Sequence, residues 1–443
     1  MSSRRDEVSE VTPPIEAARP PVIYDVTRIV TRALNAAPNG IDRVDFALAR
    51  HFLAHKERAR GALICTAIGP RLADPDLALE TIEGVESLWR EDGDPEEDDV
   101  YRKIVAALGS KDVAGSPLTR ARKPQDGLFY ARNWRALRRW APHLGQPLRE
   151  APLGAVYFNV TQFLVDRSWY MRWLKTRPDI KPVFFVHDLL PIDAPQFFRA
   201  REALLHPRRL RNICRYGAGA VVGTNAVARR LRQFAAERGR PELPVCVARL
   251  PVSPSFLSPA EAPAALDGVN YFVVCGTIEP RKNHLTLLKA WRELALDPEP
   301  PKLVIVGKRG WLNSAVIEAL EQNASLRPHV VEADGLSTPG LRRLLEGARA
   351  LLMPSFAEGF GLPVAEALAA GTPVVASDIE VFREIGGDAI DYVDPLDITG
   401  WLQAVRDYSA PHAHRRRAAL DLNNDAVAGA GFFAKIDDFI ARL

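Results

Sequence analysis

The stretch PSFAEGFGLPVAE, residues 354–366, decides the fold and the chemistry that we expect of this chain. It places two carboxylates, Glu358 and Glu366, eight positions apart. Pro363 stands where a helix accepts proline, because the first amides of a helix need no partner within it. Downstream, Gly371 and Pro373 provide the glycine and proline that commonly end a helix. The stretch therefore predicts a loop that carries Glu358, followed by a helix with Glu366 about one turn inside.

The start of this predicted helix suits an anion. The first amides of a helix are unpaired and carry the positive end of the helix dipole, so they can hold a phosphate. One acid before the helix and one on its first turn can then flank whatever is held there. A sugar attached to a nucleotide diphosphate needs this combination of donors for phosphate and acceptors for hydroxyls. The donor-binding residues that we predict in this segment are Gly359, Phe360, Gly361, Leu362 and Glu366.

The flanking sequence extends the pattern in both directions. A helix is predicted to open at 334–337 (DGLS), a strand follows at 350–353, and another begins at 373–377 (PVVAS). With EIGGD at 384–388 and AIDYVDP at 389–395, the segment closely resembles the E-x7-E region of retaining glycosyltransferases of family 4. The likeness is strong over residues 270–400 and weak in the N-terminal half. It implies an α/β chain of the GT-B fold, in which two Rossmann-like doubly wound domains face an interdomain cleft.

Size and composition fit a large soluble globular protein. The 443 residues are 47% hydrophobic and 26% charged, which allows two or three domains, and the net charge of +3 gives no reason to expect nucleic-acid binding. The four cysteines are scattered without metal-ligand spacing, which favours reduced thiols in a cytoplasmic protein. No apolar run reaches the ~18 residues that span a bilayer, so any membrane contact is expected to be peripheral, on the inner face of the cytoplasmic membrane.

Strands and helices alternate along the chain, as in parallel sheets wrapped by helices. We predict a disordered tail (1–20), an N-terminal acceptor-side domain (21–250) and a proline-rich linker (251–268). A nucleotide-sugar-binding domain (269–425) and a C-terminal helix that packs back on the N-terminal domain (426–443) follow. Ligands of such sheets bind beyond the carboxyl ends of the strands, which places the site between the domains. Neither half opens with G-x-G-x-x-G, which argues against a nicotinamide or flavin enzyme.

Residues 70–150 interrupt this alternation and are predicted to be an insertion in the N-terminal domain. They contain an acidic run at 91–99 and a basic aromatic stretch at 120–139. The basic stretch predicts either a helix packed on the domain with its arginines in solvent, or an interfacial helix on an anionic membrane. Residues 199–240 hold eleven further arginines, for which a lipid-facing and a solvated surface both stay open.

The donor diphosphate is expected at the turn after the strand 271–275. There Gly276 and Thr277 are followed by Arg281 and Lys282. The arginine guanidinium can bind a phosphate with two hydrogen bonds, and the lysine ammonium adds a compact positive charge. The turn resembles the segment with which the family grips the pyrophosphate, although many relatives have arginine where this chain has Thr277. Two further glycines follow the next strands of this half. Gly307 is expected to shape the nucleotide pocket or a plain turn, and Gly335 to lie where backbone groups meet the base.

Acceptor-side residues are predicted at the ends of N-terminal strands. His187 and Asp188 follow the apolar strand 183–186, and His187 resembles the histidine that relatives place beside the transferred sugar. Asp188 would orient the imidazole or cap the next turn. Gly40, Asp42 and Arg43 resemble the glycine loop of the first domain, with an ordinary capped helix start as the alternative.

The resemblance implies a retaining hexosyltransferase in bacterial surface polysaccharide synthesis. Glu358, His187, Arg281 and Lys282 would be its catalytic residues. Glu358 would favour positive charge near the anomeric carbon, while the basic pair stabilises the departing diphosphate. We expect no metal and no cofactor, a nucleotide-diphosphate sugar as donor, and a glycan or lipid-linked acceptor. GDP-mannose is favoured, with UDP-hexoses and dTDP-deoxysugars open. A nucleotide-sugar epimerase or hydrolase, or a degenerate scaffold protein, are the alternatives.

Overall fold

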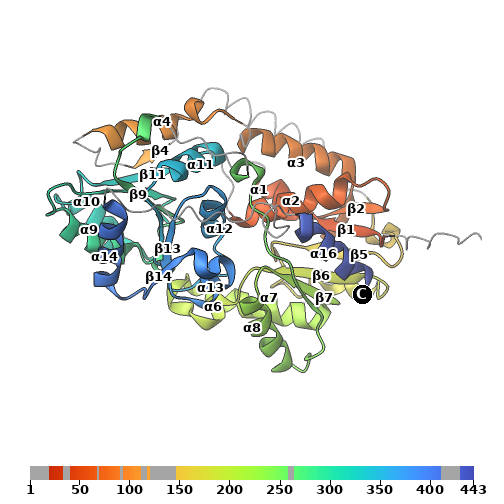
Figure 1. Cartoon of the computed structure of the whole chain (residues 1–443). Helices are drawn as coiled ribbons and strands as arrows, with labels where there is room; N and C mark the ends of the chain where they lie inside the picture. Colours follow the sequence, from red (N-terminus) through yellow and green to blue (C-terminus); the bar gives the residue numbers. More distant parts are fainter. Residues whose placement is uncertain are drawn as a thin grey trace, which may run out of the picture.

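A computed structural model describes residues 19–32, 40–66, 69–89, 93–110, 117–119, 146–257, 264–410 and 430–443. Within these ranges the chain forms two domains, each built on a sheet of seven strands (Figure 1). The predicted tail lies outside the described residues except for Arg19 and Pro20, and so does the whole basic stretch 120–139.

The N-terminal sheet has the order β3-β2-β1-β5-β6-β7-β8 and is parallel apart from the β2–β3 pair. Its strands are β1 (Val22–Asp25), β2 (Arg60–Thr66), β3 (Gly69–Ala73), β5 (Val156–Asn159), β6 (Lys181–Val186), β7 (Gly219–Val222) and β8 (Val245–Val247). Its α-helices are α1 (Thr27–Arg32), α2 (Gly40–Ala54), α3 (Pro75–Trp89), α6 (Leu190–Asp193), α7 (Ala200–Tyr216) and α8 (Asn225–Ala236). Short 3-10 helices are η2 (Leu148–Glu150), η3 (Arg172–Lys175) and η4 (Pro195–Phe197).

The C-terminal sheet has the order β14-β13-β12-β9-β10-β11-β4, with every described pair parallel. Its strands are β9 (Tyr271–Cys275), β10 (Lys302–Val306), β11 (Val330–Asp334), β12 (Leu351–Met353), β13 (Val374–Ser377), β14 (Asp391–Val393) and β4 (Leu118–Thr119). The accompanying α-helices are α9 (His284–Leu294), α10 (Ser314–Gln322), α11 (Thr338–Gly347), α12 (Leu362–Ala369), α13 (Glu380–Gly386) and α14 (Ile398–Ser409). The 3-10 helices are η7 (Pro280–Lys282) and η8 (Gly387–Ala389).

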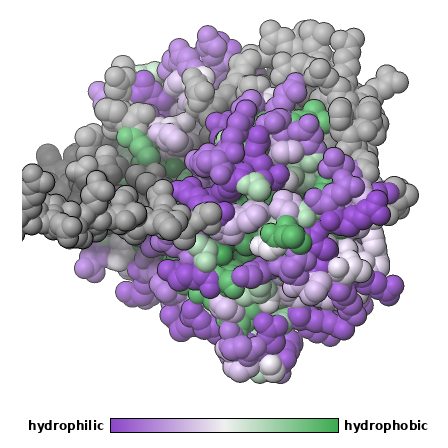
Figure 2. All heavy atoms as spheres, turned by 90° about the vertical axis from the view of Figure 1, so that its right-hand side faces the viewer, coloured by the Kyte–Doolittle hydropathy of each residue, from purple (hydrophilic) through white to green (hydrophobic). Residues whose placement is uncertain are grey.

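Burial explains why the strands are apolar on both sides. All five residues of β9 are buried, as are all four of β1, because helices cover both faces of each sheet. Trp291 and Trp401 fill the core on one face of the C-terminal sheet, and Tyr157 and Trp173 fill one face of the N-terminal sheet. The surface differs sharply: hydrophilic residues dominate the face shown in Figure 2, with hydrophobic residues in small groups.

One predicted assignment needs correction. Residues 70–150 were expected to belong to the N-terminal domain, but α4 (Asp99–Gly109) packs on β11 and α11, and β4 pairs with β11. The 3-10 helix η1 (Pro95–Glu97) also contacts α11. Lys302 of β10 fixes the end of α4 by donating to the carbonyls of Ala107 and Leu108 at 2.9 and 3.0 Å. We call the described residues 93–110 and 117–119 the α4–β4 strap. This strap completes the C-terminal sheet.

The chain returns to the N-terminal domain at its end. Helix α16 (Ala430–Ala441) places Asp437 2.8 Å from Arg58 and 3.0 Å from His51. The linker region contains η5 (Pro254–Phe256) and η6 (Ala264–Leu266), and Phe256 is fully buried. Phe256 and Leu266 thus pack against the domains, whereas Pro254, Ala265 and Asp267 of the linker are exposed. No helix in the described part of the chain combines the length and the apolar character needed to cross a membrane.

Candidate active site

The loop between β12 and α12 forms the centre of the site. Helix α12 begins at Leu362, and Gly361 is its N-cap with φ of 89°, a left-handed conformation that favours glycine. A Cβ at Gly361 would also lie 2.6 Å from a ring carbon of Phe382. Pro363 occupies the first turn as predicted, and no side chain caps the helix. The amino end of α12 is therefore suited to an anion, as its sequence predicts.

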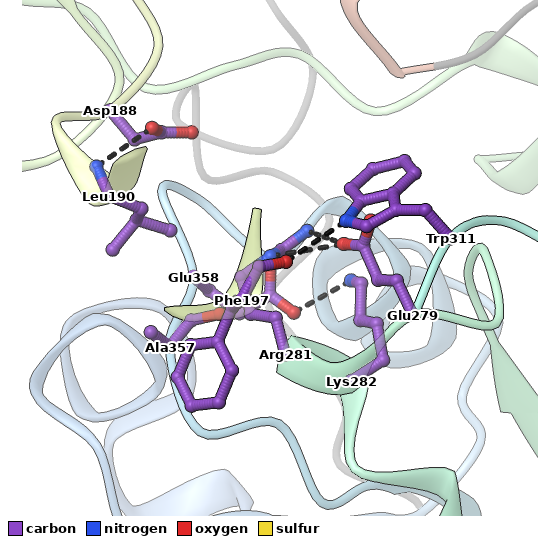
Figure 3. Close-up of polar contacts among 9 residues, drawn as sticks. All are labelled: Asp188, Leu190, Phe197, Glu279, Arg281, Lys282, Trp311, Ala357 and Glu358. Carbon is purple, nitrogen blue, oxygen red and sulfur yellow. Dashed lines mark hydrogen bonds and ion pairs between the residues drawn. The ribbon is translucent and has the colours of Figure 1, made fainter. Parts of the chain in front are cut away.

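Glu358 lies between two cations. Its carboxylate oxygens accept hydrogen bonds from Arg281 Nη1 and Lys282 Nζ, each at 2.6 Å (Figure 3). Burial alone would raise the pKa of Glu358, but the charges of Arg281 and Lys282 outweigh it and bring the pKa to about 2. Glu358 is thus ionised at every physiological pH.

The turn after β9 holds both cations in place. Gly276 has φ of 140°, and a Cβ there would lie 3.0 Å from Cε of Lys282, so the lysine stem crosses directly over this glycine. Arg281 and Lys282 belong to η7, and Asn283, with φ of 54°, joins η7 to α9. At the neighbouring strand end, a Cβ on Gly307 would collide with the carbonyl oxygen of Gly276 at 1.9 Å. Thr277 lies in the same turn, against Gly310.

A further carboxylate, which the sequence analysis did not single out, completes the cluster. Glu279 accepts a hydrogen bond from Arg281 Nη2 at 2.6 Å and is itself buried. Burial raises the pKa of Glu279, against the opposing charges of Arg281 and Lys282. Two cations therefore face two acids, and their formal charges cancel. The adjacent Arg281 and Lys282 were readable from the sequence, but Glu279, which directly precedes η7, has no signal that separates it from a surface residue.

Glu366 is buried and contacts the other domain. Its carboxylate accepts a hydrogen bond from Arg43 Nη1 at 2.7 Å, and Arg43 Nη2 donates to Thr338 Oγ1 at 3.0 Å. Gly40 begins α2, and a Cβ there would touch Leu362 at the amino end of α12. The predicted acceptor-side loop thus meets the predicted donor-side helix. Asp42 is buried and lies 3.4 Å from Arg28.

His187 and Asp188 lie beside Glu358 on the opposite domain. A Cβ on Gly359 would be 2.6 Å from the carbonyl oxygen of His187, so only glycine allows this approach. His187 Nε2 donates to the carbonyl of Val160 at 2.9 Å. Asp188 accepts from the amide of Leu190 at 3.0 Å, which favours the turn-capping role over imidazole orientation. Burial lowers the pKa of His187 to about 4, so its imidazole is neutral at physiological pH.

Several contacts that close the cleft were not predicted. Trp311, which follows the Gly307 loop, donates from Nε1 to the carbonyl of Phe197 at 2.9 Å (Figure 3). Phe197 stacks on Phe356 with ring centroids 5.4 Å apart. Thr224 donates to the carbonyl of Gly359 at 3.2 Å. The two domains are therefore in contact on both sides of Glu358.

For the predicted site residue Gly335 the structure gives only a position. Gly335 has φ of 80° and follows β11, next to Ser337, whose amide donates to Asp98 of the α4–β4 strap at 2.7 Å. Among the described residues there is no group of three or more His, Cys, Asp or Glu side chains that could hold a metal ion.

Comparisons with known proteins find relatives for part of the chain. The family described as "Glycosyl transferases group 1" matches residues 260–417. The serotype-specific mannosyltransferase WbdA of Escherichia coli is 31% identical over 252 residues, which are 53% of this chain and 31% of WbdA. The O-antigen chain mannosyltransferase B of E. coli is 34% identical over 151 residues, 34% of this chain and 39% of that protein. The chain thus spans well under half of the length of these relatives.

Solved structures extend the likeness to the whole fold. The structure of Anabaena Alr3699/HepE in complex with UDP has a TM-score of 0.53 at 16% identity and covers 96% of this chain and 98% of that one. The α,α-trehalose-phosphate synthase of Burkholderia xenovorans has a TM-score of 0.51 at 14% identity, over 72% of this chain and 79% of that one. These are glycosyltransferases of the GT-B fold, which confirms the predicted architecture. Over residues 260–417, in the C-terminal half, the chain is similar to the family of glycosyl transferases group 1.

Proposed function

We propose that this chain is a retaining, metal-independent glycosyltransferase that moves a hexose from a nucleotide-diphosphate sugar to a glycan or lipid-linked acceptor. One observation supports it above all: Glu358 is held at 2.6 Å from both Arg281 and Lys282, beside the uncapped amino end of α12. Cations and free amides suit a diphosphate, and a buried carboxylate suits the hydroxyls of the sugar attached to it.

Donor binding would exchange one set of ion pairs for another. In the structure, Glu279 and Glu358 neutralise Arg281 and Lys282. A diphosphate brings its own negative charge, so both cations can turn to it and release the carboxylate of Glu358 toward the sugar. Because Glu358 is buried and ionised, its released charge favours the positive charge that develops at the anomeric carbon.

The chemical step then needs stabilisation of the leaving group. The bond between the anomeric carbon and the phosphate oxygen breaks, and the acceptor oxygen attacks from the same face. The departing diphosphate takes the acceptor's proton while Arg281, Lys282 and the α12 amides stabilise its charge. His187 is neutral and its Nε2 proton is already donated to Val160, so we assign it a polar contact with the sugar and no proton transfer.

Glu366 would bind the ribose hydroxyls. Its carboxylate is paired with Arg43, and the nucleotide would take the place of that guanidinium. Arg43 then becomes free to approach the phosphate from the N-terminal domain. Arg43 and Glu366 would thus take part both in closing the cleft and in recognising the nucleotide.

The matching O-antigen mannosyltransferases favour GDP-mannose as donor and bacterial surface polysaccharide as the pathway. We place the reaction on the cytoplasmic side, where nucleotide sugars are made.

A donor screen tests the proposal. The chain is incubated with GDP-mannose, UDP-hexoses or dTDP-deoxysugars, with and without an oligosaccharide acceptor, in the presence of a metal chelator. Thermal shift reports binding, because a ligand of the native state raises the melting temperature. Acceptor-dependent release of nucleotide with an α-linked product supports the proposal. Free sugar or an epimer without acceptor identifies a hydrolase or epimerase, and binding without turnover identifies a scaffold protein.

A further inference from the structure

Helix α7 carries a stripe of exposed arginines on its outer face. The exposed residues of the helix beyond its first residue are Arg201, Leu204, Arg208, Arg211 and Arg215. Their spacings of three and four residues place all five within an arc of roughly 80° on a helix of 3.6 residues per turn. The stripe is about 21 Å long at 1.5 Å per residue. We call these five residues the α7 stripe.

The stripe lacks compensating acids in the described part of the chain. Arginines near it on other faces are paired: Arg209 with Glu202, and Arg230 with Asp193. Arg201, Arg208 and Arg211 have no ion pair with any described residue, and Arg215 lies over the ring of Tyr216. Four like charges on one helix face repel one another, so this arrangement is unfavourable without a partner that carries negative charge.

Apolar groups accompany the charges. Leu204, within the stripe, is 66% exposed. The loop after β5 packs against the same helix, because Asn212 donates to the carbonyl of Val165 at 2.6 Å, and this loop exposes Phe163 and half of Trp169. Arginine with exposed leucine and aromatic residues suits the interface of an anionic bilayer better than a purely polar polyanion, since apolar groups gain from burial among acyl chains.

The opposite face of α7 leads directly to the site. His206, buried one turn from Arg209, hydrogen bonds through Nε2 to the carbonyl of Asp188 at 3.1 Å. Asp188 follows His187 at the acceptor side of the cleft. A surface that binds the outer face of α7 would therefore lie one helix diameter, about 10 Å, from this strand end.

We propose that the α7 stripe is the surface on which this protein binds an anionic membrane. The arginines bind lipid phosphates, Leu204 inserts between headgroups, and the acceptor side of the cleft faces the bilayer at a short distance. The purpose of this arrangement depends on the proposed function with a lipid-linked acceptor. The binding itself does not, and its test requires no turnover.

Vesicle sedimentation with the full chain tests the proposal. The vesicles contain phosphatidylcholine alone, or phosphatidylcholine partly replaced by phosphatidylglycerol. We expect binding only to the anionic vesicles, lost in about 1 M salt, where the screening length falls to about 3 Å. Each arginine near a charged surface contributes about fivefold to the partition coefficient. Arg208→Gln with Arg211→Gln should thus lower binding about 25-fold, and Leu204→Ser should lower it further.

A matched control removes the same charge elsewhere. Arg292→Gln with Arg327→Gln changes two exposed arginines of the C-terminal domain and should leave vesicle binding unchanged. Circular dichroism and the melting temperature without ligand check that every variant keeps its fold. Equal binding of the stripe variant and the unchanged protein overturns the proposal. So does binding of a soluble polyanion such as heparin, through the stripe, when anionic vesicles do not bind.

Discussion

The charges around Glu358 are balanced only as a group. Arg281 contacts Glu279 and Glu358, and Lys282 contacts Glu358, with all four side chains buried or nearly so. Breaking a buried pair by removing one partner leaves an uncompensated charge, which typically costs about 3–5 kcal/mol. Removing any one of these four charges should therefore destabilise the protein. Variants of these residues should therefore lose stability as well as activity, and folding has to be measured beside turnover.

Replacing either member of the central pair should abolish most activity. We expect Glu358→Ala and Lys282→Ala each to lower the transfer rate by about two to four orders of magnitude, because each removes a charge aligned with the transition state. Steady-state transfer with purified variants measures the loss, and circular dichroism checks folding. Arg406→Ala, which breaks the exposed pair with Asp297, is the control and should change stability by about 1 kcal/mol or less. Near-normal turnover of either site variant would remove Glu358 and Lys282 from the mechanism.

His284, next to Lys282, predicts a pH dependence of stability. It is 1% exposed, neither ring nitrogen has a hydrogen-bond partner among the described residues, and burial lowers its pKa to about 3. Since the unfolded pKa is about 6.5, the unfolded chain binds the extra proton first. The contribution is present above pH ~6.5 and is lost as the pH falls toward the folded pKa.

His284→Leu should therefore remove part of the acid sensitivity. Between about pH 8 and pH 5 the native protein should lose about 2 kcal/mol more unfolding free energy than the variant, the product of ~1.5 pH units and 1.36 kcal/mol per unit. Urea denaturation at the two pH values measures the difference. A variant with the same pH dependence as the native chain would show that His284 is protonated in the folded state.

At the scale of elements, α8 and α13 form a contact between the domains. Glu384 of α13 accepts hydrogen bonds from the amides of Asn225 and Ala226 at 2.6 and 3.1 Å, at the first turn of α8. Thr224, the N-cap of the same helix, donates to Gly359 beside Glu358. A carboxylate at a helix start is stabilised by the free amides and by the helix dipole. The amino end of α8 thus binds the C-terminal domain at two points.

Loss of this contact should open the cleft. We expect Glu384→Ala to lower kcat/KM for the donor about tenfold. Charge-assisted hydrogen bonds contribute about 1.5–3 kcal/mol each, and hydrogen bonds from the freed amides to water would recover part of this energy. The radius of gyration from small-angle scattering should increase. Glu380, one turn earlier, pairs with Arg229 in an exposed position, so Glu380→Ala should have little effect on either quantity. Equal effects of the two variants would refute a specific role for Glu384.

Most elements could be predicted from the sequence because the parallel strands are continuous apolar runs. Tyr271–Cys275 has the predicted bounds, and Leu351–Met353 begins one residue after the predicted start. The strand β3 was missed, since Pro70 and Arg71 hide its pattern, and β4 has only two residues. The clamp of Arg281, Lys282 and Glu358 was predictable because strand ends on one sheet edge converge. Contacts such as Arg43–Glu366 were not, because they depend on the orientation of one domain against the other.

At the scale of the whole molecule, the domains approach so closely that one glycine decides the fit. A Cβ on Gly359 would lie 2.6 Å from His187 O and 2.9 Å from Asp188 Cβ, all across the interface. Gly359→Ala should therefore shift the equilibrium between closed and open cleft toward the open form. Each 1.4 kcal/mol of this shift should lower the transfer rate about tenfold. Scattering and turnover measure this. Gly109→Ala, where a Cβ meets nothing within 4 Å, is the control. A compact, active Gly359→Ala protein would contradict the geometry.

The α4–β4 strap has a consequence for protein engineering. The sheet that carries Arg281 ends with a strand supplied from far upstream, before most of the other domain has been synthesised. A fragment that starts at residue 264 would expose the unpaired backbone of β11, and bare strand edges recruit other chains. Such a truncation should form insoluble aggregates, whereas a fusion that supplies residues 93–119 should remain monomeric. Any division of this protein into separate halves must keep residues 93–119 with the C-terminal domain, because the chain crosses between the two domains.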